Sequence, residues 1–386
     1  MNLFASLFHY VLPFIVVLTP LIFVHEMGHF LVARWNKVRV EVFSIGFGRE
    51  LFGWNDRHGT RWKISVVPLG GYVKMFGQGL SEPAELPEGA TPQPLSAAEE
   101  AVSFNHKRLW QRALIVAAGP AANFLFAIVV TAIVFGTMGQ QLTATTIGKV
   151  SAGSAAEAAG LRAGDKVLMA NGRPVRSFQD LSSLVSIGLG EPLKLKILRS
   201  DFRRGDRVIE IDARPRVTQV KDIFGTNHPI GLLGVYSSGP GEVVHYGPAA
   251  AIWAATTETY NTAGNMLKTV GQMLTGTRPS NEVAGVISIA QMSSDVFNTG
   301  LWATISFIVL ISINLGLINL FPVPLLDGGH LMFYLFEAIS GRPMDRRTEE
   351  WGMRLGLALV LSLMLFAAWN DLVRIGVIRF IANLFA

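Results

Sequence analysis

The sequence contains no cysteine, which excludes disulfide bonds, thiol catalysis and zinc sites built from thiolates. It is also poor in charge, because Asp, Glu, Lys and Arg make up only 16% of the 386 residues, whereas soluble domains carry roughly a quarter. The 33 basic residues are spread along the chain and form no block, so we expect no nucleic-acid partner. Hydrophobic residues make up 50% of the chain. This composition indicates a membrane protein with room for one small soluble domain.

The first ten residues contain neither Lys nor Arg. A secretory signal peptide begins with a basic region, so we expect the first apolar run to remain in the protein. Four apolar runs are long enough to cross a bilayer as helices. They are residues 10–33, 113–137, 301–320 and 355–372.

Basic residues gather in two of the loops that join these runs. They are Arg34, Lys37, Arg39, Lys107, Arg108 and Arg112 in the first loop, and Arg342, Arg346 and Arg347 between the third and fourth runs. The positive-inside rule predicts that both loops are cytoplasmic. The N-terminus, residues 140–299 and the C-terminus are then expected outside. Arg374 and Arg379 favour the opposite orientation, but two loops outweigh one tail.

The segments between the runs predict strands and one further helix. Residues 61–76 are expected to form two strands around Gly70-Gly71, a hairpin signal. Residues 80–100 are rich in Pro, Ala and Glu and predict a flexible segment. Residues 143–217 predict a compact domain, with strands at 147–150, 166–170, 193–198 and 207–211 and a helix at 178–187. Residues 247–275 predict an amphipathic helix, lying on the outer membrane surface or packed against the domain or the spans.

The first apolar run carries three ionisable residues in the pentapeptide His25-Glu26-Met27-Gly28-His29. Such a group costs roughly 2.5 to 3.5 kcal/mol at the centre of a membrane helix, so it usually marks a functional site. Histidines four residues apart project from one helix face and can bind one metal ion, with the Glu beside them as general base. The alternative is a histidine pair that only hydrogen-bonds across a helix bundle, but this leaves Glu26 unexplained.

A catalytic zinc site usually has three protein ligands, so one more is needed. The best candidate is Asp327, which follows Pro322 and Pro324 at the end of the third run. The prolines cannot continue a regular helix, and irregular backbone at membrane depth is tolerated only when it is buried in protein or lines a wet cavity. The alternative is a helix end at the membrane interface with a solvated Asp.

The two motifs together resemble the site-2 protease family of intramembrane zinc proteases, peptidase M50. The motifs are His25-Glu26-Met27-Gly28-His29 and Asn319-x-x-Pro322-x-Pro324-x-Leu326-Asp327-Gly328. Residues 143–217, with Ala-Ala-Gly-Leu-Arg-Ala-Gly-Asp at 158–165, resemble the PDZ domain inserted in the bacterial, RseP-like branch of that family. The best-known members of this branch carry two tandem PDZ domains, whereas this sequence predicts one, because residues 223–246 are too short for a second.

The resemblance implies a polytopic α-helical membrane protein with four transmembrane helices, a membrane-associated β-hairpin and an inserted periplasmic PDZ domain. We expect it in a bacterial inner membrane, with both termini and the PDZ domain periplasmic and the active site toward the cytoplasm. The expected parts are residues 1–139 with the first two spans, 140–217 with the PDZ domain, 218–298 with the membrane-proximal amphipathic helix, and 299–386 with the last two spans.

The implied activity is endoproteolysis of single-span membrane proteins, such as anti-sigma factors, after another protease has trimmed their external part. The resemblance implies that His25, His29 and Asp327 hold Zn²⁺ and that Glu26 takes the proton of the attacking water. It also implies substrate contacts from Asn319, Pro322, Pro324, Gly119, Asn123, Gly70, Gly71 and Tyr72. A strand edge of the hairpin could receive the unwound substrate, and the PDZ domain would either tether substrates or exclude those with bulky external domains.

These contacts have plainer interpretations, and so does the chain as a whole. Asn319 could only cap carbonyls beside the prolines, Gly119 and Asn123 could serve helix packing around Pro120, and the hairpin could be an ordinary cytoplasmic one. A membrane scaffold with a PDZ domain and a vestigial metal site is one rival class of protein, although it would not need Glu26. A zinc or proton transporter is another, although the second and fourth runs carry almost no ionisable residues before Asp371.

Overall fold

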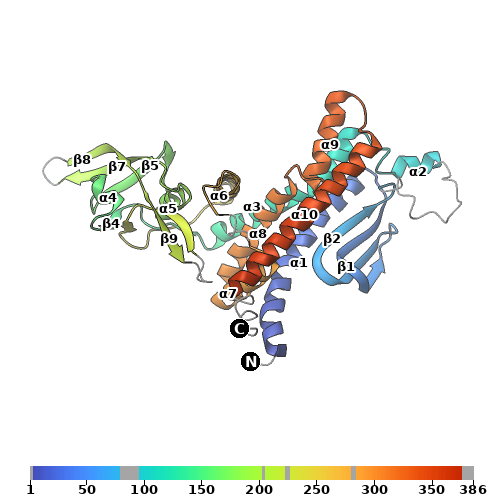
Figure 1. Cartoon of the computed structure of the whole chain (residues 1–386), viewed down its shortest axis with the longest axis horizontal. Coiled ribbons are helices and arrows are strands. Elements are labelled where there is room, and N and C mark those ends of the chain that lie inside the picture. Colours follow the sequence, from blue (N-terminus) through green and yellow to red (C-terminus); the bar gives the residue numbers. More distant parts are fainter. Residues whose placement is uncertain (1–2, 79–94, 202–204, 222–226, 280–283, 376–386) are drawn as a thin grey trace, which may run out of the picture. The chain divides into compact units, whose positions relative to one another are not determined.

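The computed structural model describes residues 3–78, 95–201, 205–221, 227–279 and 284–375. The chain divides into two compact units, the first of residues 1–129 and 284–371 and the second of residues 130–283 and 372–386. Each unit is described by itself, and Figure 1 labels the elements of both. Residues 284–298, the end of the expected membrane-proximal part, are grouped with the first unit. The four expected parts stay a prediction.

Four helices of the described residues are long and apolar enough to cross a membrane. They are α1 (Leu3–Trp35), α3 (Leu109–Thr137), α8 (Leu301–Asn319) and α10 (Arg346–Ile375). The prediction of a multi-pass membrane protein with four helical spans is therefore confirmed. Helices α1 and α3 approach each other closely, since a Cβ added to Gly28 would lie 2.2 Å from the carbonyl oxygen of Ala118. Only glycine fits at this crossing.

A helix that the sequence did not predict, α7 (Val286–Thr299), packs against α1 and α8. Its first turn is held by Asp371 of α10, a fully buried carboxylate. The Asp371 oxygens accept hydrogen bonds from the backbone N–H groups of Gly285, Ile287 and Ser288 at 3.1, 3.0 and 3.1 Å. A carboxylate is favoured there because the first N–H groups of a helix have no partner within the helix. Asp371 thus serves to bind α7.

The segment between the last two spans is more than the loop that the sequence indicated, because it contains α9 (Asp327–Ser340). Arg112 of α3 holds α9 in place, with Nη2 at 2.7 Å from Oε1 of Glu337 and the guanidinium 5.0 Å from the centre of the Tyr334 ring. Burial raises the pKa of Tyr334 to about 12, so its hydroxyl stays protonated at neutral pH. The helix ends at Gly341, which takes a left-handed conformation (φ +66°) that glycine adopts without strain.

The predicted hairpin exists, but its turn lies elsewhere. Its strands are β1 (Val40–Asn55) and β2 (Arg61–Met75), which lie alongside α1 in Figure 1. The turn between them is residues 56–60, where Oδ1 of Asp56 accepts hydrogen bonds from the N–H groups of His58 and Thr60. The expected turn at Gly70-Gly71 is wrong, because both glycines lie inside β2. A Cβ at Gly71 would lie 2.7 Å from the carbonyl oxygen of Ser44, so the glycine permits close approach and forms no turn.

Aromatic side chains fix this sheet to α1. The Phe43 and Trp62 rings stack 4.4 Å apart, and Phe30 of α1 contacts both of them edge-on. The predicted flexible segment 80–100 lies outside the described residues up to position 94, and its last part contains the short helix α2 (Ala97–Val102), which Ser96 caps.

The second unit contains the strand-rich domain, and its predicted strands and helix are confirmed. A four-stranded sheet has the order β6-β5-β7-β8, and three strand pairs are formed by β11 with β4, β12 with β3, and β10 with β9. The strands are β3 (Gln140–Gln141), β4 (Ile147–Val150), β5 (Lys166–Ala170), β6 (Arg173–Pro174), β7 (Leu193–Asp201), β8 (Gly205–Ala213), β9 (Arg216–Lys221), β10 (Asn227–Leu232), β11 (Val235–Ser237) and β12 (Val243–Val244). The helices are α4 (Ala155–Ala158), α5 (Phe178–Ile187) and α6 (Pro248–Leu274).

The domain has a core of its own, made of buried aliphatic residues from the sheet, α4 and α5, including Leu181, Leu195 and Ile197. Beside it Asp165 is buried, with 1% of its side chain exposed, and accepts two hydrogen bonds of 2.7 Å from the Arg199 guanidinium. Asp165 also accepts a hydrogen bond from the N–H of Arg162. This pairing holds the loop before β5 against β7.

Candidate metal centre

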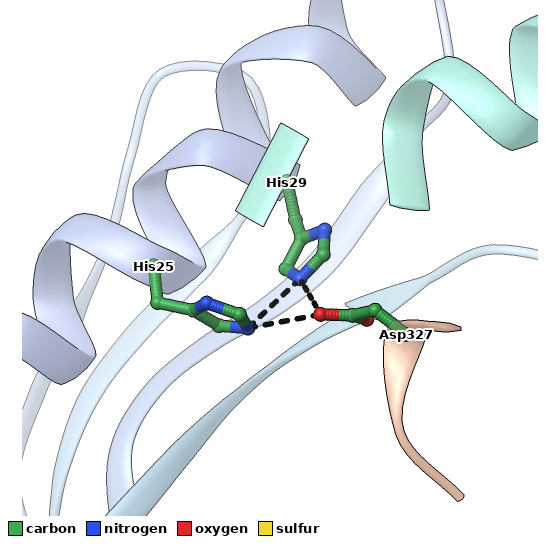
Figure 2. A group of neighbouring side chains, drawn as sticks. All are labelled: His25, His29 and Asp327. Atoms are coloured by element: carbon green, nitrogen blue, oxygen red, sulfur yellow. Dashed lines mark hydrogen bonds and ion pairs between the residues drawn. The ribbon is translucent and has the colours of Figure 1, made fainter. Parts of the chain in front are cut away.

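His25 and His29 lie one turn apart on α1, and Asp327 is the first residue of α9. Figure 2 shows the three side chains pointing toward one another. The two Nε2 atoms are 3.3 Å apart, and Oδ2 of Asp327 lies 3.2 Å from that of His25 and 3.5 Å from that of His29. Both histidines are 9% exposed. Of the groups formed by the described residues, this is the one with three such ligand atoms in reach of one ion.

These separations fit a tetrahedral zinc ion. Zinc binds imidazole nitrogen and carboxylate oxygen at about 2.0–2.1 Å, which places neighbouring ligand atoms of a tetrahedron about 3.3–3.4 Å apart. The three measured distances, 3.3, 3.2 and 3.5 Å, match this spacing. Three protein ligands leave the fourth position open, which is the arrangement of catalytic rather than structural zinc sites.

A single face of α3 supports both imidazoles through Ile115, Gly119 and Asn123, which are spaced four residues apart. The Nδ1–H of His29 donates a hydrogen bond of 2.9 Å to the carbonyl oxygen of Ile115. This bond leaves the Nε2 lone pair of His29 free for a metal. Gly119 leaves the space that the rings need, since a Cβ there would lie 2.2 Å from Nε2 of His29 and 2.9 Å from Cε1 of His25.

Asn123 is fully buried and contacts His25. Its Nδ2 lies 3.1 Å from Nδ1 of His25, and its Oδ1 has no hydrogen-bond partner among the described residues. Amide oxygen and nitrogen are assigned from their partners, and turning the amide by 180° lets Oδ1 accept a hydrogen bond from Nδ1–H. That tautomer frees Nε2 of His25 for the metal. The orphaned oxygen therefore fits a metal-binding His25.

Glu26 lies beside this group without belonging to it. It is 8% exposed and interacts electrostatically with His25, His29 and Asp327. Its Cγ also contacts β2, because a Cβ added to Gly71 would lie 2.9 Å from it. The Glu26 side chain is thus close to the three candidate ligands and also touches β2.

The irregular segment 320–326 places Asp327. The Leu325 backbone takes a positive φ of +94°, which is uncommon for a residue with a Cβ and costs of order 1–3 kcal/mol. Gly328 and Gly329 let this segment fold onto the start of α9, since added Cβ atoms would lie 2.3 Å from the Leu320 carbonyl oxygen and 2.4 Å from that of Val323. The expectation that the prolines break the helix before Asp327 agrees with this backbone.

The remaining predicted site residues occupy different surroundings. Asn319 is half-buried at the end of α8, Pro324 is half-buried and Pro322 is exposed. Tyr72 stacks on Phe47 at 6.2 Å between ring centres, and Gly70 lies against the same Phe47 ring. Gly119 and Asn123 touch the histidines themselves. The sequence pointed to their motif, but it could not reveal this contact, because His25 and Asn123 are 98 positions apart.

The fold and the site together define a class of protein. It is a membrane protein with four helical spans and a buried His-His-Asp group beside a glutamate. The family model for "Peptidase family M50" matches residues 13–363. A protein of Rhizobium meliloti (strain 1021) named "Putative zinc metalloprotease" is 39% identical over 376 residues, covering 96% of this chain and 99% of that protein. "Metalloprotease MmpA" of Caulobacter vibrioides is 37% identical over 389 residues, covering 96% of each chain.

The chain therefore belongs to peptidase family M50, the site-2 protease family, and is a membrane zinc metalloprotease with Zn²⁺ as its metal. The family resemblance predicted from the two motifs is confirmed.

Proposed function

We propose that this protease cleaves transmembrane segments of single-span membrane proteins, such as anti-sigma factors, after their external parts have been trimmed. The observation that carries this proposal is the buried His25–His29–Asp327 group on a membrane span, with ligand atoms at tetrahedral spacing. A protease whose reacting centre lies inside a span meets peptide bonds that are themselves in the membrane.

In this proposal His25, His29 and Asp327 hold the metal through their neighbouring Nε2 and Oδ2 atoms. Bound zinc supplies Lewis acidity, which acidifies water and polarises the scissile carbonyl. Glu26 takes the proton of the attacking water and later passes a proton to the leaving amine. The Ile115 carbonyl and the Asn123 side chain keep the imidazoles oriented, and burial limits the access of bulk water.

A helical substrate must unwind before hydrolysis, because its carbonyls are engaged in hydrogen bonds along the helix. In the described sheet Gly71 pairs with Ile45 and Tyr72 with Ser44, all on the β1 side. We propose that the other edge of β2 around Gly70, Gly71 and Tyr72 receives the unwound segment as an added strand. Since Gly71 touches Glu26, such a segment would pass close to the base. Asn319, Pro322 and Pro324 would line the approach on the α8 side.

We assign the strand-rich domain to the PDZ class and place it in the periplasm of a bacterium, with the metal site toward the cytoplasmic side of the inner membrane. The support is its order of strands and helices, the 158–165 motif before β5, and the basic loops that favour a cytoplasmic location. There the domain would screen substrates by the size of their external parts.

The first test of this proposal is metal removal from the purified, reconstituted chain. Cleavage of a single-span substrate with a short external stub is expected to stop when a chelator removes zinc and to return when one equivalent is restored. A matched substrate with a folded external domain is expected to resist cleavage. If zinc-loaded protein cleaves none of a panel of short-stub substrates, the membrane scaffold becomes the better interpretation.

A second prediction concerns the support of His25. Asn123→Ala is expected to weaken zinc binding by about 10- to 100-fold, the usual effect of losing the hydrogen-bond partner of a metal-binding histidine. Asn123→Asp keeps an acceptor for Nδ1–H and should lose less. Competition with a chromogenic chelator measures both affinities. Ser312→Ala is the control, because among the described residues its hydroxyl bonds the backbone oxygen of Asn123 and not the Asn123 side chain. Equal zinc affinity in Asn123→Ala and the control would contradict this role.

A further inference from the structure

The fourth span, α10, supplies none of the three candidate ligands, but it touches the segment that ends in Asp327. Gly356 of α10 is buried, and a Cβ added to it would lie 1.9 Å from the carbonyl oxygen of Pro324 and 2.8 Å from the Pro324 Cβ. Any side chain at this position would therefore displace the backbone of Pro324. Since Pro324 stands three residues before Asp327, α10 contacts the chain that leads directly into the proposed ligand.

Pro324 is also contacted from α9. A Cβ added to Gly329 would lie 2.6 Å from the Pro324 Cα and 2.4 Å from the carbonyl oxygen of Val323. Gly329, however, belongs to the helix that Asp327 begins, and it lies only five residues from Pro324. The contact with α9 therefore moves with the ligand, whereas α10 is a separate element that can fix the segment from outside.

The backbone between Pro324 and Asp327 takes a conformation that needs such a support. Leu325 has a φ of +94°, a region that residues with a Cβ rarely adopt. Conformations of this kind persist only where the surrounding structure fixes them. Gly356 lies against the residue that directly precedes Leu325, so the support is applied next to the strained position.

Helix α10 is in turn connected to the helix that carries the two histidines. Asp371, fifteen residues beyond Gly356 on α10, accepts hydrogen bonds from the start of α7. Helix α7 packs against α1, on which His25 and His29 lie. A continuous series of contacts thus runs from the histidines through α7 and α10 to Pro324.

We propose that Gly356 is a positioning residue of the metal centre. Through it α10 packs directly on Pro324, fixes the turn at Leu325 and so holds Oδ2 of Asp327 at the distance from the histidines that a metal ion requires. This inference rests on the proposed assignment of Asp327 as a metal ligand. Gly356 acts through Pro324 and is not itself a catalytic residue.

The alternative is that Gly356 serves only the packing of two helices, because glycines four residues apart are common where membrane helices meet. Gly352 stands four residues before Gly356 and provides the matched control. Its added Cβ would lie 3.0 Å from Cζ of Phe333, the end of a ring that can give way, and 3.9 Å from Cγ of Pro324. Gly352→Ala therefore makes the same change on the same helix without displacing the Pro324 backbone.

Gly356→Ala is expected to weaken zinc binding by about 10- to 100-fold, the usual loss when the support of a metal ligand is disturbed. Gly352→Ala should keep the affinity of the unmodified protein. Both affinities are measured on the purified full chain by competition with a chromogenic chelator. The visible absorption of bound Co²⁺, which depends on the number and arrangement of its ligands, should change in Gly356→Ala and stay the same in Gly352→Ala.

Thermal unfolding of the metal-free protein separates positioning from packing. A lower unfolding temperature of Gly356→Ala with unchanged zinc affinity and Co²⁺ absorption would mean that the glycine serves packing alone, and would overturn the proposal. Equal losses of zinc affinity in Gly356→Ala and Gly352→Ala would overturn it too. Asp327→Ala, measured beside them, tests the ligand itself. Full affinity in Asp327→Ala would refute the proposed ligand set, whereas zinc loss there with full affinity in Gly356→Ala would refute only this inference.

A second background keeps the test decisive if Gly356→Ala does not accumulate as folded protein. Glycine adopts a positive φ without strain, so in Leu325→Gly the turn can yield to the added Cβ while the chain still folds. Adding Gly356→Ala to Leu325→Gly is again expected to lower zinc affinity relative to Leu325→Gly alone. The same affinity in both would show that α10 does not position Asp327.

Discussion

Glu26→Gln is expected to retain its zinc and to cleave about 10² to 10⁴ times more slowly than the unmodified protein, the range that a positioned acid–base group contributes. The loss should lie near the upper end, because Glu26 is proposed to act twice, first as base and then as acid. Zinc should stay, since the three ligand atoms belong to His25, His29 and Asp327. Glutamine has the same shape, so the packing against Gly71 is preserved.

Cleavage of the short-stub substrate and zinc content are measured on the same preparations. Glu210→Gln is the matched control, because Glu210 is an exposed residue of β8 whose partner is Lys196. Undiminished cleavage by Glu26→Gln would refute its role as base. Loss of zinc from this variant would instead make Glu26 a ligand and require a different base. The experiment also separates the protease from the scaffold, because a scaffold would show no cleavage with either the unmodified protein or Glu26→Gln.

The transporter interpretation becomes weaker once the position of Asp371 is known. A transport path needs ionisable groups that are free to bind and release ions along the spans. Asp371, the carboxylate that the sequence left unexplained in the fourth span, accepts hydrogen bonds from three N–H groups of the α7 start. Its charge is thus used to stabilise a helix end, and the His25–His29–Asp327 group remains the functional cluster.

The sequence predicted the parts of the site that depend on helix periodicity. The spacing of His25 and His29 places both on one face of a helix, whatever surrounds it. The sequence also predicted the neighbourhood of Asp327, because the prolines before it break the third span in a way that needs a functional reason. The structure brings these residues together although 298 positions separate His29 from Asp327.

Prediction from local sequence patterns failed where a glycine allows two parts of the chain to approach closely. In the sequence, Gly70-Gly71 looks like a hairpin turn. In the structure Gly71 lies inside β2. Glycine is needed there because Ser44 and Glu26 leave no room for a side chain. The helices α7 and α9, each of 14 residues, are too short to register as spans. Both depend on partners far away in sequence, Asp371 for α7 and Arg112 for α9.

Gly119→Ala gives the second large effect, and it tests the packing of α3 against the metal centre. The added Cβ would lie 2.2 Å from Nε2 of His29, the atom proposed to bind zinc, and 2.5 Å from Cε1 of the same ring. The Cβ would also lie 2.9 Å from Cε1 of His25, so both imidazoles must move. We expect zinc binding to fall by at least about 100-fold, the upper range for disturbing a ligand's support, and cleavage to be lost with it.

The same substitution elsewhere in α3 controls for its effect on the helix. Alanine is favoured over glycine inside a helix by about 1 kcal/mol, so Gly119→Ala should not fail through helix propensity. Gly136→Ala places its Cβ 3.9 Å from the nearest atom and should keep full zinc content and cleavage. Zinc titration and thermal unfolding of both variants separate a displaced metal site from a destabilised protein. Full zinc affinity in Gly119→Ala would mean that α3 does not pack against His29 as described, and the support assigned to Ile115 and Asn123 would fail with it.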